Sequence, residues 1–581
     1  MTHVRLLFAS PDVRRIDGSH GTWFVSALVE EQLCRLVADA RTIDAIAGEL
    51  AAVTEDATVV HVSRTDRGGT VEAFRSVTSS RPLYYLTGSD GQVVITDHYR
   101  NALAQLDVAD RTTSRRAVAD HLLFRSPVAP TTYVEAVRQL GRGELLRWDG
   151  GRADWSRELV DQLSAAADCE PATARDRIDE SLSDIVDGAV TSTTRTMFSG
   201  GVDSTLLHSY RDESAPATHL AVDSPEFDRG TGAFEEASSA LDVDPEQVSI
   251  RESAFREHLE RTVDALGQPP RYNQTVFTDA GFRSLDRGRY LNGHGADALF
   301  GLQGLKGARI ADWLGATVPL LDSVASVAPV QVPDSVAALQ RRREQLQAPV
   351  STPGSLAQDL ASAIHPEAVA AILDSAIVAE RVNRRTEYGH RRAELTADSR
   401  FARQVESGHL VDFLADDGVS QWRQIGATHG QLVVAPFRSR RLARCALSVP
   451  PDRRYVRGVD DLPDLQPKYL LKSLLAERLP SYPTGCRKGD GSLPIRRYVE
   501  SGPLSDVFDR YRPPTFVPPS ARHRHVDSFG PLTWPLLTFA VWRARVRDEP
   551  ELPPVPGTED HVIRLPRDPP SPVANGRPPG P

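Results

Sequence analysis

Residues 195–210, RTMFSGGVDSTLLHSY, place two hydroxyls, two glycines and an acid within six positions. A short apolar run precedes the segment Phe198-Ser199-Gly200-Gly201-Val202-Asp203-Ser204, and a helix-like sequence follows it. At a junction between a strand and a helix, glycines let the backbone approach a ligand closely, and backbone N–H groups and hydroxyls bind phosphate oxygens. The stretch therefore predicts a cradle for phosphate or pyrophosphate. It does not follow the Walker pattern, because no Gly-Lys-Ser/Thr comes after the glycines.

Asp203 is the unexpected member of this cradle, because a carboxylate repels phosphate unless a cation lies between them. Mg²⁺ is the fitting cation, since it binds one or two carboxylates together with phosphate oxygens. A second acid is then expected at another strand end. Asp297 meets this requirement, because it follows a Gly-X-Gly turn in RYLNGHGADALFG, residues 289–301. Asp203 and Asp297 are together predicted to hold Mg²⁺.

The surrounding elements fit a parallel sheet. Ile178, Leu182, Ile185 and Val186 recur at helical spacing, and strands are expected at 195–198, 217–224 and 289–292 with helices between them. Such alternation predicts an α/β domain whose ligands bind at the carboxyl ends of the strands. Residues 1–150 instead contain short β-branched or aromatic runs separated by turn signals, which favours a β-rich sandwich.

Composition narrows the class of protein. A formal charge of -10 over 581 residues argues against a nucleic-acid partner, and no apolar stretch is long enough for a membrane span. The four cysteines are far apart, which favours a reducing cytoplasm over a disulfide scaffold or a zinc site. We expect three regions: a sandwich at 1–165, an α/β domain at 172–548, and a Pro-rich disordered tail at 549–581.

Several motifs together resemble the asparagine synthetase family of ATP pyrophosphatases. They are FSGGVDST, NGHGADALFG, SRPLYYLTGSDGQVVITDHYRNAL, VVAPFRSRRLARCALSVP and PKYLLKSLLAERLPSYPTGCRKGDGS. The resemblance implies an Ntn-hydrolase-like glutaminase domain before an adenine nucleotide α-hydrolase-like synthetase domain, with ATP and Mg²⁺ as cofactors. It assigns nucleotide binding to Phe198, Ser199, Gly200, Gly201, Asp203, Ser204, Val222, Asn292 and Gly293.

The chain departs from the family at three positions. Glutamine-hydrolysing members carry a nucleophilic cysteine after Met1, and this chain has Thr2, so we expect the sandwich to be an inactive glutaminase. Ala298 stands where the family has Glu. His294 replaces a Glu or Tyr, and with an ordinary pKa of about 6.5 it is suited to take a proton from an attacking amine. A histidine that only hydrogen-bonds its own loop is the alternative.

Lys488, in CRKGDGS, matches the family's catalytic lysine, which stabilises negative charge in the transition states. Family members without the cysteine include β-lactam synthetase, carbapenam synthetase and lasso peptide cyclase. The resemblance favours a lasso peptide cyclase: a ligase that adenylates a side-chain carboxylate of a core peptide and lets the peptide's α-amine close a macrolactam. Its partners would be the precursor peptide, a leader peptidase and a leader-binding protein. A small-molecule amide ligase and an inactive ATP-binding scaffold remain as alternatives.

Overall fold

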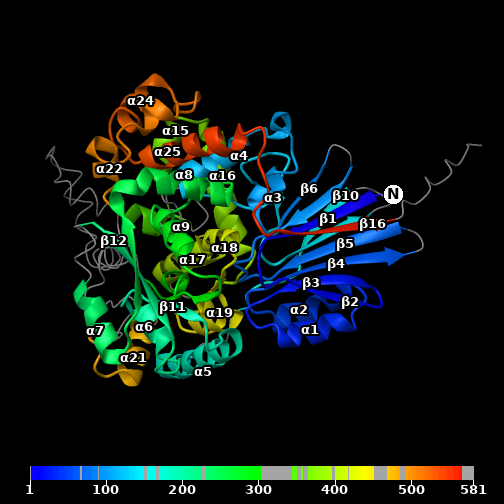
Figure 1. Ribbon diagram of the computed structural model, residues 1–581, viewed down its shortest axis with the longest axis vertical. Helices are drawn as coiled ribbons and strands as arrows, with labels where there is room; N and C mark the ends of the chain where they lie inside the picture. The colour runs from blue at the N-terminus through cyan, green and yellow to red at the C-terminus, as the bar shows by residue number, and fades with distance from the viewer. Residues whose placement is uncertain are drawn as a thin grey trace, which may run out of the picture.

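The computed structural model describes most of the chain. The described residues are 2–65, 68–88, 91–149, 154–164, 169–224, 231–301, 343–349, 355–357, 364–395, 400–415, 418–450, 454, 468–484 and 493–565. Among them, no helix combines the length and apolar character that crossing a membrane requires. Figure 1 shows a β-sandwich on one side of the molecule and a larger α/β part on the other.

The N-terminal region is a sandwich of two sheets, ordered β16-β1-β7-β6-β8 and β10-β9-β5-β4-β3-β2. Alternate apolar side chains of both sheets, among them Leu6, Val62 and Ile95, meet in a buried layer between them. This arrangement confirms the predicted sandwich. The strands are β1 (Thr2–Phe8), β2 (Arg14–Gly18), β3 (Gly21–Ser26), β4 (Thr58–Thr65), β5 (Gly68–Arg75), β6 (Tyr84–Thr87), β7 (Val93–Thr96), β8 (Arg138–Gln139), β9 (Glu144–Asp149), β10 (Asp154–Leu159) and β16 (Glu559–Leu565).

The second region is built on a five-stranded, wholly parallel sheet ordered β13-β12-β11-β14-β15. Its strands are β11 (Arg195–Met197), β12 (Ala217–Asp223), β13 (Glu246–Arg251), β14 (Arg289–Leu291) and β15 (Leu432–Val434). The chain first builds outward from β11 to β13 and then returns to the other side of β11 with β14. The strand order therefore reverses between β11 and β14, and ligands of such sheets bind beside this reversal.

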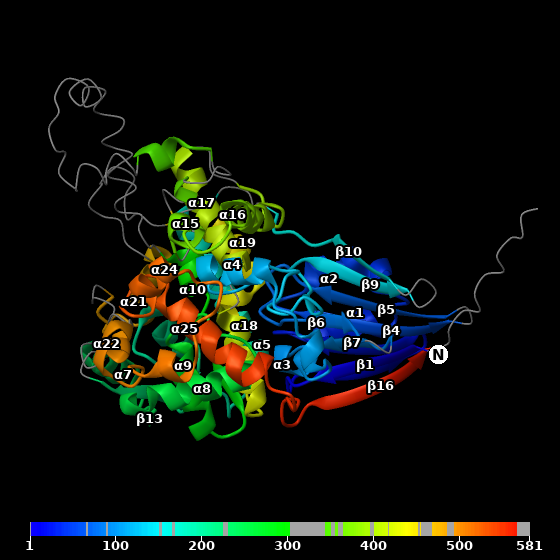
Figure 2. The same cartoon turned by 90° about the horizontal axis from the view of Figure 1, so that it is seen from above.

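Helices cover both faces of this sheet (Figures 1 and 2). One face packs against α5 (Pro171–Ala189), α6 (Val202–His208), α19 (Arg440–Leu447) and α21 (Tyr469–Arg478). The other packs against α8 (Phe255–Leu266), α9 (Thr275–Ser284) and α18 (Gly418–Thr428). The predicted α/β architecture is confirmed. Further α-helices of this region within the described residues are α7 (Thr231–Leu241), α10 (Ala296–Phe300), α15 (Pro366–Ala370), α16 (Ser375–His390), α17 (Arg400–Ala415), α22 (Ile495–Ser501), α23 (Val507–Arg510), α24 (Pro519–His525) and α25 (Thr533–Trp542).

The two regions share one apolar core. Four helices accompany the sandwich: α1 (Glu31–Ala38), α2 (Ala47–Val53), α3 (Tyr99–Leu103) and α4 (Arg115–Phe124). Residues of α3 and α4 lie in a single buried cluster with residues of α8, α9, α16 and α25, including Tyr99, Phe255 and Trp542. The continuity of this cluster fixes the sandwich against the α/β region.

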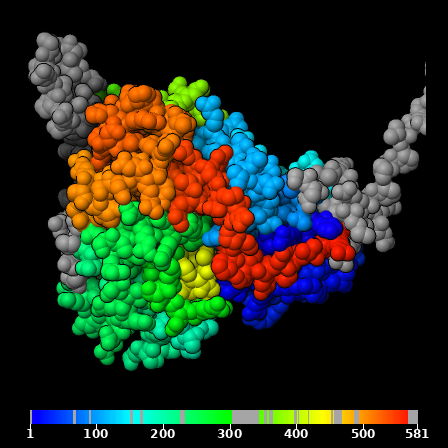
Figure 3. Space-filling model, turned by 45° about the horizontal axis from the view of Figure 1, so that its top comes forward, coloured from blue at the N-terminus to red at the C-terminus, as the bar shows by residue number. Residues whose placement is uncertain are grey.

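The C-terminal segment differs from its prediction. The sequence predicts a disordered tail at 549–581, but β16 pairs antiparallel with β1 from Thr2–Leu565 to Phe8–Glu559. Leu565 is fully buried between the sheets, and Arg5 forms an ion pair with Asp560 at 2.7 Å. The prolines on either side of this segment favour a prediction of disorder, but the segment forms a strand because it pairs with the edge of the sheet at β1. Figure 3 shows this segment running from the α/β region onto the sandwich; residues 566–581 lie outside the described part.

Truncation after residue 558 is therefore expected to destabilise the protein, because it removes a strand of the sandwich and the buried Leu565. Burial of one such side chain contributes about 2 kcal/mol, and the lost strand pairing adds to this. We expect the thermal midpoint of unfolding to fall by several degrees. Truncation after Leu565 is the matched control and should leave the midpoint unchanged, since residues 566–581 are Pro-rich. Equal midpoints for the two truncations would contradict a stabilising role for β16.

Candidate active site

The glycine-rich loop leaves β11 at the point where the strand order reverses. Phe198 is buried, and its N–H donates to the carbonyl of Thr218 on β12 (2.8 Å), which fixes the start of the loop. Ser204, on the first turn of α6, donates through Oγ to the carbonyl of Gly201 (3.1 Å) and accepts the N–H of Ser199 (3.2 Å). The two serines thus close the loop on itself, as expected of a preformed anion cradle.

Position 200 of this loop accepts only glycine. Its φ is +71°, and a Cβ there would lie 2.4 Å from Cα of Phe234, so no other residue fits. The hydroxyl of Tyr482 donates to the Gly200 carbonyl (2.9 Å) and so fixes the orientation of this peptide group. Tyr482 did not emerge from the sequence, because it lies far along the chain in an irregular segment.

Asp203 and Asp297 lie close together, around the ammonium of Lys468. Nζ of Lys468 is bonded to Oδ2 of Asp203 and lies 2.8 Å from Oδ1 of Asp297. The lysine is nearly buried, whereas the Asp297 side chain is 57% exposed. Burial would lower the pKa of Lys468, but the charges of Asp203 and Asp297 raise it above its ordinary value. Lys468 is therefore a fixed cation and not a base.

The position of Lys468 depends on a strained backbone. It precedes α21 with a φ of +60°, a conformation that L-residues seldom adopt, and its N–H donates to the carbonyl of Phe300 (2.8 Å). Phe300 ends α10, the helix that carries Asp297. The same contact therefore holds the ammonium and the second carboxylate together. The PKYLLKSLL motif pointed to this segment without indicating that its first lysine meets both acids.

The residues present fit Mg²⁺ bound together with ATP. Two carboxylates on the helices that follow adjacent strands match the ion's preference, and phosphate oxygens would complete its shell. Within the described ranges, no group of three or more His, Cys, Asp or Glu side chains could hold a metal ion without such help. Asp203 and Asp297 would hold the ion, and it would neutralise charge on the departing pyrophosphate.

The second glycine-rich loop follows β14 and meets the first. A Cβ on Gly293 would lie 2.8 Å from Cβ of Asp203, so the glycine permits this close approach. Asn292 is buried and accepts the N–H of His294 through Oδ1 (2.6 Å). The His294 ring is thereby presented beside two other partly exposed rings, 5.4 Å from Trp422 and 6.2 Å from Tyr272. The loop thus places an imidazole next to the cradle and an aromatic surface beyond it.

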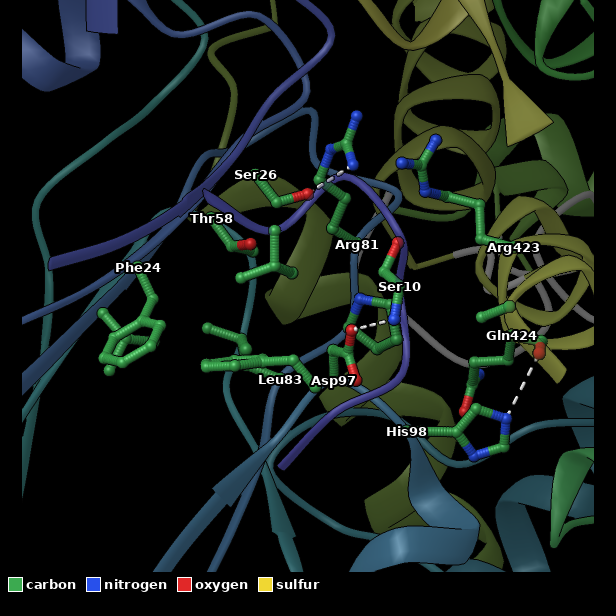
Figure 4. Close-up of a pocket in the computed structure, with 15 residues that line it drawn as sticks. Ser10, Phe24, Ser26, Thr58, Arg81, Leu83, Asp97, His98, Arg423 and Gln424 are labelled. Carbon is green, nitrogen blue, oxygen red and sulfur yellow. Dashed lines mark hydrogen bonds between the residues drawn. The ribbon is translucent and has the colours of Figure 1, made fainter. Parts of the chain in front are cut away.

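Trp422 is positioned through the interface with the sandwich. Its neighbours Arg423 and Gln424 on α18 line a narrow hollow between the two regions (Figure 4). Arg423 approaches Asp12 (3.4 Å), and the carbonyl of Gln424 bonds Nε2 of His98 (3.2 Å). Burial raises the pKa of Asp97 in this hollow to about 6, while its carboxylate accepts the N–H groups of Ala9 and Ser10. This polar network fixes α18, and with it the aromatic surface.

Val222 lies near the carboxyl end of β12, the strand that pairs with β11, where it is half-buried and pairs in register with Ile250. Its role in nucleotide binding stays a prediction. Lys488 lies outside the described residues, so its role stays a prediction. The other predicted residues belong to the two loops that meet at the reversal of the sheet or to the helices that follow these loops, and they are Phe198, Ser199, Gly200, Gly201, Asp203, Ser204, Asn292, Gly293, His294 and Asp297.

Fold and loops together define a ligand-binding α/β domain whose phosphate cradle faces a pair of carboxylates. Comparison with family models identifies residues 175–520, more than half of the chain, as asparagine synthase, and the chain belongs to this family. Its members are ATP-dependent ligases that form amides, which assigns this general activity to the chain. Comparison with curated proteins gives no match.

Proposed function

We propose that this protein is an ATP-dependent, macrolactam-forming peptide cyclase of the kind that makes lasso peptides. A side-chain carboxylate of the core peptide attacks the α-phosphorus of ATP, the bond to the β-phosphate breaks, and pyrophosphate leaves. The peptide's own α-amine then attacks the acyl-adenylate, the new amide forms, and AMP leaves. His294 takes the proton that the amine loses, because its ring lies beside the loop that meets Asp203.

One observation carries this proposal: in the described part of the chain, no thiol lies at the end of the sandwich where β1 begins, and Leu565 fills this end. Thr2 pairs with Leu565, and the Leu565 side chain lies between the sheets where a Cβ on Gly69 would be only 2.5 Å away. Three cysteines are described, on α1, just before α5 and on α19, so none of them is at this end. Without a thiol there, the sandwich would not release ammonia from glutamine, and the amine must come from the substrate.

The aromatic surface supports a peptide substrate. Trp422, Tyr272 and His294 are each partly exposed and lie side by side next to the cradle. Such rings combine a large apolar area with polar atoms at the edge, which suits the apolar and backbone surface of a peptide. A leader peptidase and a leader-binding protein would supply the free α-amine that the reaction consumes.

The test is single-turnover reaction of the protein with ATP, Mg²⁺ and the linear core peptide of a precursor encoded beside its gene. We expect AMP and a product lighter by one water, with fragmentation placing the ring between the α-amine and an acidic side chain. The N-acetylated peptide is the matched control and should give pyrophosphate without a ring. Glutamate should not form from glutamine in either case. Ring formation that requires added glutamine, or glutamate production lost on Thr2→Ala, would contradict the proposal.

A further inference from the structure

A second cluster of charged side chains surrounds the end of α4, apart from the phosphate cradle. Arg125 caps this helix with a φ of 63° and a ψ of 9°, the left-handed conformation that helix ends ordinarily give to glycine. A side chain in this conformation costs about 1 kcal/mol relative to glycine. The surroundings of the Arg125 guanidinium indicate a role for an arginine at this position.

Two further arginines lie against the same helix end. Nη1 of Arg271 donates to Oγ of Ser126 (2.9 Å), and the guanidinium of Arg385 lies over the ring of Phe124 at 4.6 Å. Both approach the same oxygen of Asp412, at 3.5 and 3.4 Å. Asp412 is 40% exposed. Positive charge thus gathers around the end of α4, where α4 lies beside α16 in both views (Figures 1 and 2).

Arg125 has no anionic partner in the described part of the chain. No carboxylate there lies within ion-pair distance of its guanidinium, and its Nε is buried without a hydrogen-bond partner. Burial and the neighbouring charge of Arg271 both lower the pKa of Arg125, which means that its charged form is poorly accommodated by the protein alone. A buried donor of this kind ordinarily has an acceptor, because a buried donor without a hydrogen bond costs about 1–3 kcal/mol.

The arginine cluster is joined to the active site by aromatic rings. Arg271 lies over the ring of its neighbour Tyr272, 5.1 Å from the centroid, and that ring is 6.2 Å from the His294 ring. The backbone N–H of Arg271 donates to Gln421 (2.8 Å), the residue before Trp422. A substrate lying along these rings would have one end at the cradle and another at the arginines.

We propose that Arg125 and Arg271 bind a carboxylate of the substrate other than the one that is joined to AMP. This inference rests on the proposed ligase function, since it assigns a second recognition point to the same substrate. The reacting carboxylate must reach the α-phosphate at the cradle. The ring of Tyr272 lies between the His294 ring and the Arg271 guanidinium. The group bound by the arginines is therefore an acidic side chain or a terminal carboxylate farther along the peptide.

The test measures binding of three capped tetrapeptides by calorimetry, in the presence of Mg²⁺ and an ATP analogue with a non-cleavable α,β bond. The diacid probe is acetyl-Glu-Ala-Ala-Glu-amide, and each counterpart has one Glu replaced by Gln. We expect the diacid to bind about tenfold or more tightly than either counterpart, as the loss of one charged hydrogen-bonded contact implies. Arg125→Gly should abolish this preference without lowering the thermal midpoint, because glycine suits the left-handed position.

Asp242→Gly is the matched control, because Asp242 is exposed and also has a positive φ of 51°. It should keep the preference for the diacid. Equal binding of the three probes by the wild-type protein, no measurable binding of the diacid, or a preference that survives Arg125→Gly would each overturn the proposal. Pyrophosphate release from cleavable ATP with the linear core peptide separates the two hypotheses. A preference for the diacid probe without any release from the core peptide would refute the cyclase function and leave the carboxylate site standing.

Discussion

Asp203→Asn is expected to reduce pyrophosphate release to the background rate while leaving the fold intact. The carboxylate lies at the meeting point of the two glycine-rich loops and contacts the buried ammonium of Lys468. An amide has the same shape but no charge, so it would bind Mg²⁺ weakly and leave the charge on the departing pyrophosphate uncompensated. Loss of such a contact ordinarily costs about 10²–10³ in rate or more.

Asp297→Asn is expected to have the same outcome, although Asp297 is the more exposed acid. The measurement is AMP and pyrophosphate formation in a single turnover, with circular dichroism as the test of folding. Asp212→Asn is the matched control, since Asp212 is an exposed acid shortly after α6 and should have no effect. Turnover near the wild-type rate in either active-site variant would remove that acid from the metal site.

The sequence predicts that the two acids lie close together, because each follows a strand of the same parallel sheet. Glycine-rich turns follow two short apolar runs, and carboxyl ends of parallel strands lie at one edge of a sheet. Asp203 and Asp297 therefore had to be close if both runs were strands of one parallel sheet. The reversal of strand order between β11 and β14 makes them neighbours.

Other parts of the site could not be predicted, because they depend on backbone conformations and distant contacts that leave no local pattern. Lys468 and Arg125 both have a positive φ, yet neither position is a glycine. Leu565 is buried only because an open edge of β1 accepts β16, and the prolines around this strand indicate disorder when read alone. Sequence periodicity reports local structure, whereas these three residues are held by tertiary packing.

Lys468→Ala is the second substitution with a large expected effect, and it separates charge stabilisation from metal binding. We expect pyrophosphate release to fall about 10²–10³-fold, because a preorganised cation beside the developing charge is lost. Lys468→Arg should not restore the rate, since a broad guanidinium does not replace a compact ammonium between two carboxylates. Lys472→Ala, one turn further along α21, is the matched control.

Stability provides the second readout for Lys468, independent of turnover. Without the ammonium that both carboxylates contact, the negative charges of Asp203 and Asp297 would repel one another. The alanine variant should therefore unfold at a lower temperature than the wild-type protein in a metal chelator, and Mg²⁺ with ATP should narrow the difference. The wild-type protein should gain less from Mg²⁺, because the Lys468 ammonium already offsets half of the charge of the two acids. An equal gain in thermal stability in both proteins would mean that Lys468 and the metal do not share these carboxylates. A wild-type rate of pyrophosphate release in the alanine variant would exclude Lys468 from the chemistry and leave Lys488 as the cation that supports it.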